Sequence, residues 1–220
     1  MNDLNDLKRL LAAGAKISLM IRHTERYAIP TDDETFGAAV ELTPAGHEMA
    51  LALGQGLAGF PIDSVLASPI KRCRETAADI LKGSGQTRLA VWDEELIGVR
   101  NPYFLDSVKV QHWMRQEGYF EVMLRYLHNG TEPFHRPLGE ASEMLRNLLE
   151  ADGLEKFRLL VSHDSVCASY ASNYGIRTGF SRDNWVGYLH GLLVYRLPGS
   201  KWETKWFVPD KERVFGHFVQ

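Results

Sequence analysis

Residues 17–26 read Ile-Ser-Leu-Met-Ile-Arg-His-Thr-Glu-Arg, a short apolar run followed directly by charge. The run at 17–21 is typical of a buried strand, because strands covered on both faces are apolar along their whole length. At its end, Arg22 and Arg26 place two guanidinium groups around the imidazole of His23. Buried cations need partners and like charges repel, so this cluster indicates a bound anion. A phosphate beside a nucleophilic imidazole fits best.

The same arginines allow a second interpretation. On their own, Arg22 and Arg26 could form a solvated pair with the carboxylates of Glu25 and Asp32. Which interpretation holds depends on what the rest of the chain brings to the end of the strand.

Length and composition are those of an ordinary globular protein. The 220 residues are 45% hydrophobic and 24% charged, and we expect one domain spanning residues 1–220. A net charge of −3 argues against a nucleic-acid partner. No apolar run reaches the roughly 18 residues that a membrane helix needs, so we expect no membrane association.

Two further features indicate the compartment. The segment 1–6 carries two acids and no basic residue, unlike a secretory signal. The two cysteines, Cys73 and Cys167, are too few for a disulfide framework, and we interpret both as reduced thiols on apolar helix faces. These features predict a cytoplasmic protein.

Strand-like and helix-like segments alternate along the chain. The predicted strands are 17–21, 64–67, 88–92 and 158–162, with a terminal hairpin of 192–197 and 202–208. The predicted helices are 5–13, one from Thr43-Pro44 to Leu57, one from Ser68-Pro69 to Gly83, 140–150 and 165–174; Thr43 and Ser68 are the expected N-caps. This order predicts a three-layer α/β/α fold with a mainly parallel central sheet.

The segment 98–137 is aromatic and has little strand character. We expect helices that pack on the core, with one or two rings at the edge of a pocket, forming a lid insertion over the site. Residues 27–36 are expected to shape the same pocket, and residues 182–185 and 188–191 are candidates for its C-terminal border.

Charged residues follow three of the predicted strands. They are Arg22, His23, Arg26, Arg72, His163 and Asp164. Ligands in open α/β sheets bind beyond the carboxyl ends of the strands, so these side chains could converge on a single anion. The helices that start near Ser68 and Asp164 would add backbone donors and positive dipole ends.

Four motifs occur in order between residues 17 and 170. They are Arg22-His23-Thr24, Leu42-Thr43-Pro44-Ala45-Gly46, Ser68-Pro69-Ile70-Lys71-Arg72 with Glu75-Thr76-Ala77, and Ser162-His163-Asp164. With these motifs the chain resembles the histidine phosphatase superfamily, the group of phosphoglycerate-mutase-like and acid-phosphatase-like enzymes. The resemblance implies a phosphoglycerate-mutase-like fold with His23 as the nucleophile that takes up the phosphoryl group. It further implies that Arg22, Arg72 and His163 bind the phosphate oxygens, with Arg26 beside them.

The resemblance leaves two choices for the general acid. Arg26 and the pair His163-Asp164 look like the acid-phosphatase branch, in which the aspartate after the second histidine protonates the leaving oxygen. The mutase-like branch uses a glutamate after the third strand, where this chain has Gly98. We therefore assign the acid to Asp164, with Glu95, or its neighbour Glu94, as the alternative.

Physical chemistry supports the same roles. An imidazole must be neutral to attack, so one ring nitrogen of His23 needs an acceptor, for which we expect a backbone carbonyl. The surrounding arginines should keep His23 unprotonated, and arginine forks suit phosphate oxygens.

The sequence thus predicts a metal-independent phosphatase that hydrolyses a small-molecule phosphomonoester through a phosphohistidine intermediate. The alternatives are a phosphomutase and an inactive module that binds phosphate esters. We expect no cofactor and no metal, since the eight histidines form no zinc-protease motif and no Cys-x-x-Cys pair exists. The sequence gives no indication of oligomeric state.

Overall fold

A six-stranded sheet forms the centre of the computed structural model, which describes residues 3–209. The strands are β1 (Lys16–Arg22), β2 (Ser64–Ala67), β3 (Val91–Asp93), β4 (Phe157–Ser162), β5 (Gly191–Arg196) and β6 (Glu203–Phe207). Their order is β3-β2-β4-β1-β5-β6. The pairs β1–β4, β2–β4 and β2–β3 are parallel, whereas β5 is antiparallel to both β1 and β6. The prediction of a mainly parallel sheet with a terminal hairpin is confirmed.

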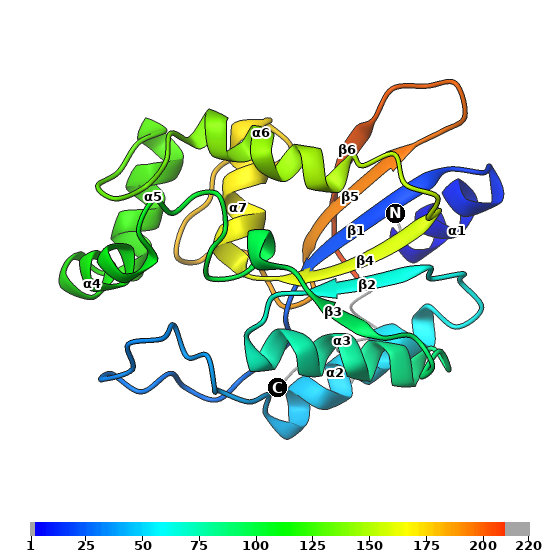
Figure 1. Ribbon diagram of the computed structural model, residues 1–220, viewed down its shortest axis with the longest axis horizontal. Coiled ribbons are helices and arrows are strands. Elements are labelled where there is room, and N and C mark those ends of the chain that lie inside the picture. The colour runs from blue at the N-terminus through cyan, green and yellow to red at the C-terminus, as the bar shows by residue number, and fades with distance from the viewer. Residues whose placement is uncertain (1–2, 210–220) are drawn as a thin grey trace.

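Helices cover both faces of this sheet, as Figure 1 shows for α2 and α3 on one side and α6 and α7 on the other. The helices are α1 (Asp3–Ala12), α2 (Pro44–Gly56), α3 (Lys71–Gly83), α4 (Ser107–Glu117), α5 (Tyr119–Asn129), α6 (Leu138–Leu149) and α7 (Asp164–Asn173), with a 3₁₀ turn at Glu95–Ile97. Each helix of the described residues is too short or too polar to cross a membrane.

The position of β1 between two helical layers explains the apolar residues Ile17, Leu19, Met20 and Ile21. Leu19 and Ile21 lie in one core cluster with residues of α1, α2 and α3. Met20 points the other way, into a second cluster with residues of α4 to α7. Successive side chains of a strand face opposite sides, so a strand between two helical layers is apolar on both faces. The exception is the buried Ser18, whose hydroxyl donates to the Leu149 carbonyl at 2.7 Å.

Two local predictions are wrong. Ser68 does not cap a helix: α3 begins at Lys71 with Ile70 as its N-cap and without a side-chain cap, and the Ser68 hydroxyl bonds to His163 instead. The third strand is shorter and later than 88–92, because the chain turns where the Leu89 amide donates to the Gln86 carbonyl. As a result, β3 has three residues, and each pairs with one residue of β2.

The start of α2 is as predicted and fixes the loop after β1. The Thr43 side chain accepts a hydrogen bond from the Gly46 amide at 3.0 Å, and Pro44 occupies the first turn. A Cβ atom on Gly46 would lie 2.0 Å from the Glu25 carbonyl oxygen. Glycine is therefore required at position 46, where the helix meets the chain leaving β1.

The segment 98–137 forms α4 and α5, as predicted, with Val122 and Tyr126 buried in the second core cluster. The loop after β1 reaches across to α4, where the Gln111 side-chain amide donates to the Asp33 carbonyl at 3.1 Å. These two parts of the chain form one wall beside the carboxyl ends of the strands. That the segment moves as a lid stays a prediction.

Candidate active site

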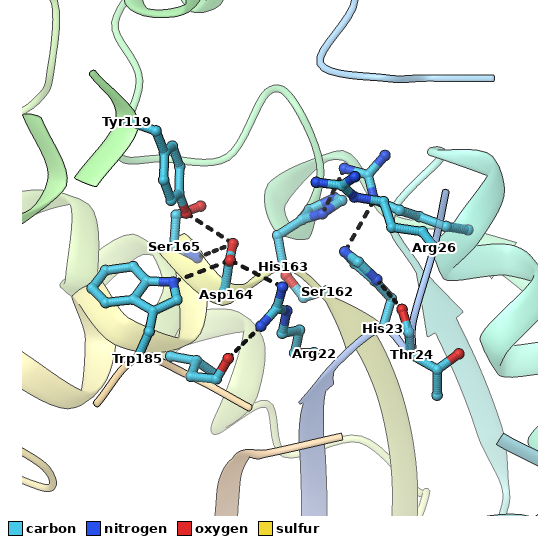
Figure 2. Close-up of polar contacts among 12 residues, drawn as sticks. Arg22, His23, Thr24, Arg26, Tyr119, Ser162, His163, Asp164, Ser165 and Trp185 are labelled. Atoms are coloured by element: carbon cyan, nitrogen blue, oxygen red, sulfur yellow. Dashed lines mark hydrogen bonds and ion pairs between the residues drawn. The ribbon is translucent and has the colours of Figure 1, made fainter. Parts of the chain in front are cut away.

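The strand ends bring the predicted charged residues together around one pocket of about 360 Å³. Its lining includes Arg22, His23, Arg26, Arg72, His163 and Asp164, the six residues expected from the sequence. Arg22 closes β1, His163 and Asp164 follow β4, and Arg72 lies in the first turn of α3. Figure 2 shows the polar contacts of Arg22, His23, His163 and Asp164 at this site.

His23 is buried, at 3% exposure, and held in a single tautomer. Its Nδ1 lies 2.7 Å from the Thr24 carbonyl, which can only accept, so Nδ1 carries the proton. Its Nε2 accepts from Nε of Arg72 at 3.0 Å, so this nitrogen is unprotonated. Burial, followed by the charge of Arg72 and the neighbouring His163, lowers the pKa of His23 well below its ordinary value. The imidazole is therefore neutral.

Arg72 ties the pocket together. Beyond His23, its Nη1 donates to the carbonyls of Phe36 and Gly37 at 3.2 and 2.8 Å. Its Nη2 lies 3.3 Å from Nδ1 of His163. Because a guanidinium only donates, Nδ1 of His163 is the accepting nitrogen.

The second histidine is also neutral. Nε2 of His163 donates to the Ser68 hydroxyl at 2.8 Å. Burial and the charge of Arg72 lower the pKa of His163 to about 3. Beside His163, burial raises the pKa of Cys73 to about 12, so Cys73 stays a thiol.

Asp164 is bonded through both of its carboxylate oxygens (Figure 2). Its Oδ1 accepts from the Tyr119 hydroxyl at 2.9 Å and from the Ser165 amide at 2.8 Å. Its Oδ2 accepts from the Trp185 indole at 3.1 Å and lies 3.4 Å from Nη2 of Arg22. Burial disfavours the carboxylate, but the charge of Arg22 and the bonds from Tyr119 and Trp185 outweigh it and lower the pKa of Asp164.

Arg22 contacts Asp164 on one side and the chain at Val186 and Tyr188 on the other. Its Nη1 donates to the Val186 carbonyl, and its guanidinium stacks 4.5 Å from the ring centroid of Tyr188. Its Nε is buried and has no hydrogen-bond partner among the described residues. A buried donor of this kind is one that a bound anion could satisfy.

The solvated-pair interpretation does not hold. Within residues 3–209, neither Arg22 nor Arg26 pairs with Glu25 or Asp32. The Glu25 carboxylate accepts from the Thr43 hydroxyl at 2.7 Å. Arg26 lines the pocket, with Nη1 on the Tyr27 carbonyl at 2.7 Å.

The remaining motif residues fasten these elements to one another. The Thr24 amide donates to the Thr76 hydroxyl of α3 at 3.2 Å. The Leu42 amide donates to the Glu75 carboxylate at 2.8 Å. Both bonds join the chain around β1 to α3, so they hold His23 and Arg72 in register.

The alternative acids lie elsewhere. Glu94 accepts from the Leu96 amide at 3.0 Å at the start of the 3₁₀ turn, and Glu95 is exposed; neither lines the pocket. Gly98 does line it, and a Cβ there would come 2.9 Å from Pro69. Asp164 is the single carboxyl group lining the pocket within the described residues.

The structure adds residues that the sequence did not single out. Trp185 and Tyr188 fall in the segments expected to border the site, but Tyr119 was one aromatic among many in 98–137. Ser68 was interpreted as a helix cap. Nothing in a single sequence marks a tyrosine as the donor to an aspartate 45 positions away.

Metal binding finds no support in side-chain clustering. In the part of the chain that the structure describes, no group of three or more His, Cys, Asp or Glu side chains could hold a metal ion. Cys73 and Cys167 are both buried and free, as predicted.

Strand ends of an α/β sheet and the first turn of α3 thus gather two histidines and three arginines in one pocket, and arginine forks suit phosphate oxygens. The sequence matches the histidine phosphatase superfamily (branch 1) over residues 19–203, and the chain belongs to this superfamily. That Arg26 and the pair His163-Asp164 look like the acid-phosphatase branch stays a prediction.

Solved structures show the same fold. The mycobacterial glucosyl-3-phosphoglycerate phosphatase superposes with a TM-score of 0.58 at 15% identity, covering 89% of this chain and 100% of that one. Phosphoglycerate mutase from Bacillus anthracis superposes with a TM-score of 0.59 at 18% identity, covering 91% and 95%. YhfR of Bacillus stearothermophilus gives 0.58 at 12%, covering 89% and 98%. No curated protein matches the sequence.

Proposed function

We propose that the protein is a metal-independent phosphatase that hydrolyses a small-molecule phosphomonoester through a phosphohistidine on His23. The observation that carries this proposal is the fixed tautomer of His23. Its Nδ1 is committed to the Thr24 carbonyl, and its lone pair on Nε2 faces the guanidinium of Arg72. A neutral imidazole, held by one nitrogen and surrounded by phosphate-binding cations, is a nucleophile for phosphorus.

In the first step, Nε2 of His23 attacks the phosphorus and the ester P–O bond breaks. The bound phosphate takes over the N–H donors of Arg72, which frees the lone pair on Nε2. Arg22, Arg26 and Arg72 neutralise the oxygens, which is the main requirement of phosphoryl transfer. Asp164 protonates the leaving alkoxide. The products are the free alcohol and a phosphohistidine.

In the second step, water attacks the phosphorus of the phosphohistidine and the N–P bond breaks. The carboxylate of Asp164 takes the proton from this water, which restores the acid for the next cycle. Inorganic phosphate then leaves, and Nδ1 of His23 keeps its proton throughout.

Asp164 must carry a proton for the first step, although its pKa is low in the structure. A phosphate dianion adds negative charge beside Asp164 and neutralises Arg22, and both changes raise the pKa of the carboxyl group. Substrate binding therefore favours the protonated acid, and a rate optimum on the acidic side of neutral is expected.

The test is acid or alkaline quench after mixing with ³²P-labelled substrate. We expect an acid-labile, alkali-stable phosphoprotein in the wild type and none in His23→Ala, whose turnover falls by about 10⁴-fold or more. His112→Ala, an exposed histidine outside the pocket, serves as the matched control and keeps both signals. A wild type that turns over substrate without such a phosphoprotein would contradict the proposal.

Phosphomutase activity is the second candidate, because phosphoglycerate mutase is among the structures with this fold. The two activities differ in product: a phosphatase accumulates inorganic phosphate, whereas a mutase accumulates an isomeric phosphoester. Affinity for phosphate esters without either product would instead indicate a binding module. Addition of a chelator should leave the rate unchanged.

We also propose a cytoplasmic location. The two buried free thiols support it, since a reducing compartment keeps such cysteines reduced. Cell fractionation with an antibody against the protein tests it.

A further inference from the structure

The lining of the pocket divides into two chemically distinct parts. The cations and histidines gather around His23, where the charges of Arg22 and Arg26 act on Arg72 and His163. The other part is apolar: Ile29, Phe36, Ile70, Val99, Phe104 and Met114. A ligand whose phosphate lies against His23 must place its alcohol moiety along this apolar part.

The amide of Asn101 also lines the pocket but is already committed. Its Nδ2 donates to the Gly98 carbonyl at 2.8 Å, and its oxygen accepts from the Tyr103 amide at 3.1 Å. Asn101 therefore shapes the wall without offering a free polar group to the alcohol moiety of a substrate.

An aromatic pair makes up the centre of the apolar part. Phe36 and Phe104 stack with ring centroids 5.9 Å apart and an interplanar angle of 18°. Phe36 comes from the loop after β1 and Phe104 from the segment before α4. Such a pair offers a ligand ring a flat apolar surface and further offset or edge contacts.

This surface is held in place from several sides. The Asp33 carboxylate accepts from the Gly37 amide at 2.6 Å, and the Asp33 carbonyl accepts from Gln111. Arg72, which contacts His23, also donates to the carbonyls of Phe36 and Gly37. Arg72 is therefore bonded both to His23 and to the backbone that carries the Phe36 ring, which joins the two parts of the pocket.

We propose that the substrate is the phosphomonoester of an uncharged alcohol that carries an aromatic or similarly flat apolar group, and that Phe36 and Phe104 determine this specificity. The inference rests on the proposed function, because it takes the His23 end of the pocket as the phosphate site. A second acidic group on the alcohol, as in a phosphoglycerate, would face the apolar wall without a cation of its own and at the cost of its hydration.

The experiment compares kcat/KM for 2-phenylethyl phosphate and ethyl phosphate, two alkyl esters whose leaving alcohols differ in the ring and little in basicity. The wild type should prefer the phenyl compound by about 10- to 100-fold, the range that burial of a ring in an apolar pocket supports. Phe104→Ala should lower that preference by about tenfold. Leu105→Ala, whose side chain is exposed and does not line the pocket, should leave the preference unchanged.

Binding of phenylphosphonate and methylphosphonate, which cannot be hydrolysed, gives a measurement independent of turnover. Calorimetry on the wild type should show tighter binding of the phenyl compound, by a similar ratio, and loss of that ratio in Phe104→Ala. If both esters are hydrolysed equally well and both phosphonates bind equally, the inference is overturned while the proposed function stands. If neither ester is hydrolysed but the phosphonate preference holds, the proposed function fails and the apolar specificity stands.

Discussion

Two buried arginines lie near opposite ends of β4 and differ in how their guanidinium groups are satisfied. Arg158, the second residue of the strand, is 9% exposed, and its Nη2 donates to oxygens only: the Ser18 hydroxyl at 2.7 Å and the carbonyls of Leu148 and Leu149 at 2.8 Å. These carbonyls end α6, the negative end of a helix dipole, where a cation is favoured. Arg158 is thus satisfied within the protein.

Arg72, beyond the other end of the strand, is 5% exposed and lies in the opposite situation. Its Nη1 donates to two backbone carbonyls, but its other two bonds go to imidazole nitrogens. Its neighbours Arg22 and Arg26 are cations that repel it. Burial of an arginine is therefore no indication of an anion site by itself. The indication is a surplus of positive charge over acceptors, which the buried and unpartnered Nε of Arg22 also shows.

The largest effect that separates Arg72 from Arg158 is expected from replacing Arg72. Arg72→Met should lower kcat/KM for a phosphomonoester by about 10³-fold, because an arginine that stabilises the transferring phosphoryl group carries an effect of this order. Its thermal midpoint should stay close to that of the wild type, since the substitution also relieves repulsion from Arg22 and Arg26. Steady-state kinetics and thermal unfolding check both. An Arg72→Met protein that unfolds readily but retains its rate would make Arg72 a structural residue like Arg158.

The next effect concerns the carboxyl group that pairs with Arg22. Asp164→Asn should lower kcat for an alkyl phosphate by about 10²- to 10⁴-fold, the range of a general acid. For 4-nitrophenyl phosphate, whose leaving group needs no proton, the loss should be less than about tenfold. The measurement is the loss of kcat in Asp164→Asn on each of the two substrates. Glu95→Gln is the matched control, because Glu95 lies outside the pocket and should matter for neither. Equal losses on both substrates would mean that Asp164 only orients Arg22.

The difference between the two arginines also shows what a sequence can reveal. The charged cluster at the end of β1 was predictable, because ligands in an open α/β sheet bind beyond the carboxyl ends of the strands. Charged residues directly after an apolar strand therefore indicate a binding site. The four motifs then put Arg72 and His163 at the same edge, and the structure brings all six predicted residues to one pocket. The surroundings of Arg158 could not be predicted from the sequence in this way, since its partners include backbone carbonyls of another element.

What the sequence could not reveal depends on contacts between distant segments. Ser68 looked like a helix cap because Ser-Pro commonly starts a helix, yet its hydroxyl is hydrogen-bonded to Nε2 of His163, 95 positions away. Tyr119 and Phe104 belong to an aromatic segment in which most rings serve the core, as Tyr103 and Tyr126 do. Only the register of that segment against the loop after β1 separates the rings of the pocket from the rings of the core.

Removing Arg158 should give the reverse of the Arg72 result, with a smaller effect. Arg158→Met leaves the last carbonyls of α6 without their cationic donor, which should lower the free energy of unfolding by about 2 kcal/mol. The rate per folded molecule should change by less than about threefold, because Arg158 does not line the pocket. Denaturant unfolding and kinetics at low temperature measure the two quantities. Inorganic phosphate should raise the thermal midpoints of the wild type and of Arg158→Met, and not that of Arg72→Met.

The smallest effect should come from Tyr119, which acts only through Asp164. For an alkyl phosphate, kcat should fall as pH rises, because Asp164, whose pKa the bound phosphate raises, loses the proton that it must donate. Burial and nearby cations hold the pKa of His23 well below its ordinary value, so His23 stays neutral over this range. The Tyr119 bond stabilises the carboxylate, so Tyr119→Phe raises the pKa of Asp164 and should move the falling limb to higher pH by less than about one unit.

The control for this shift is Tyr126→Phe, a buried tyrosine whose hydroxyl donates to the Arg136 carbonyl outside the pocket. It should leave the limb where it is. The substrate's own ionisation, with a second pKa of about 6, is common to all variants and cancels when their pH profiles are compared. A limb that stays in place in Tyr119→Phe, or moves to lower pH, would show that another group supplies the proton, and the assignment of the acid to Asp164 would fall with it.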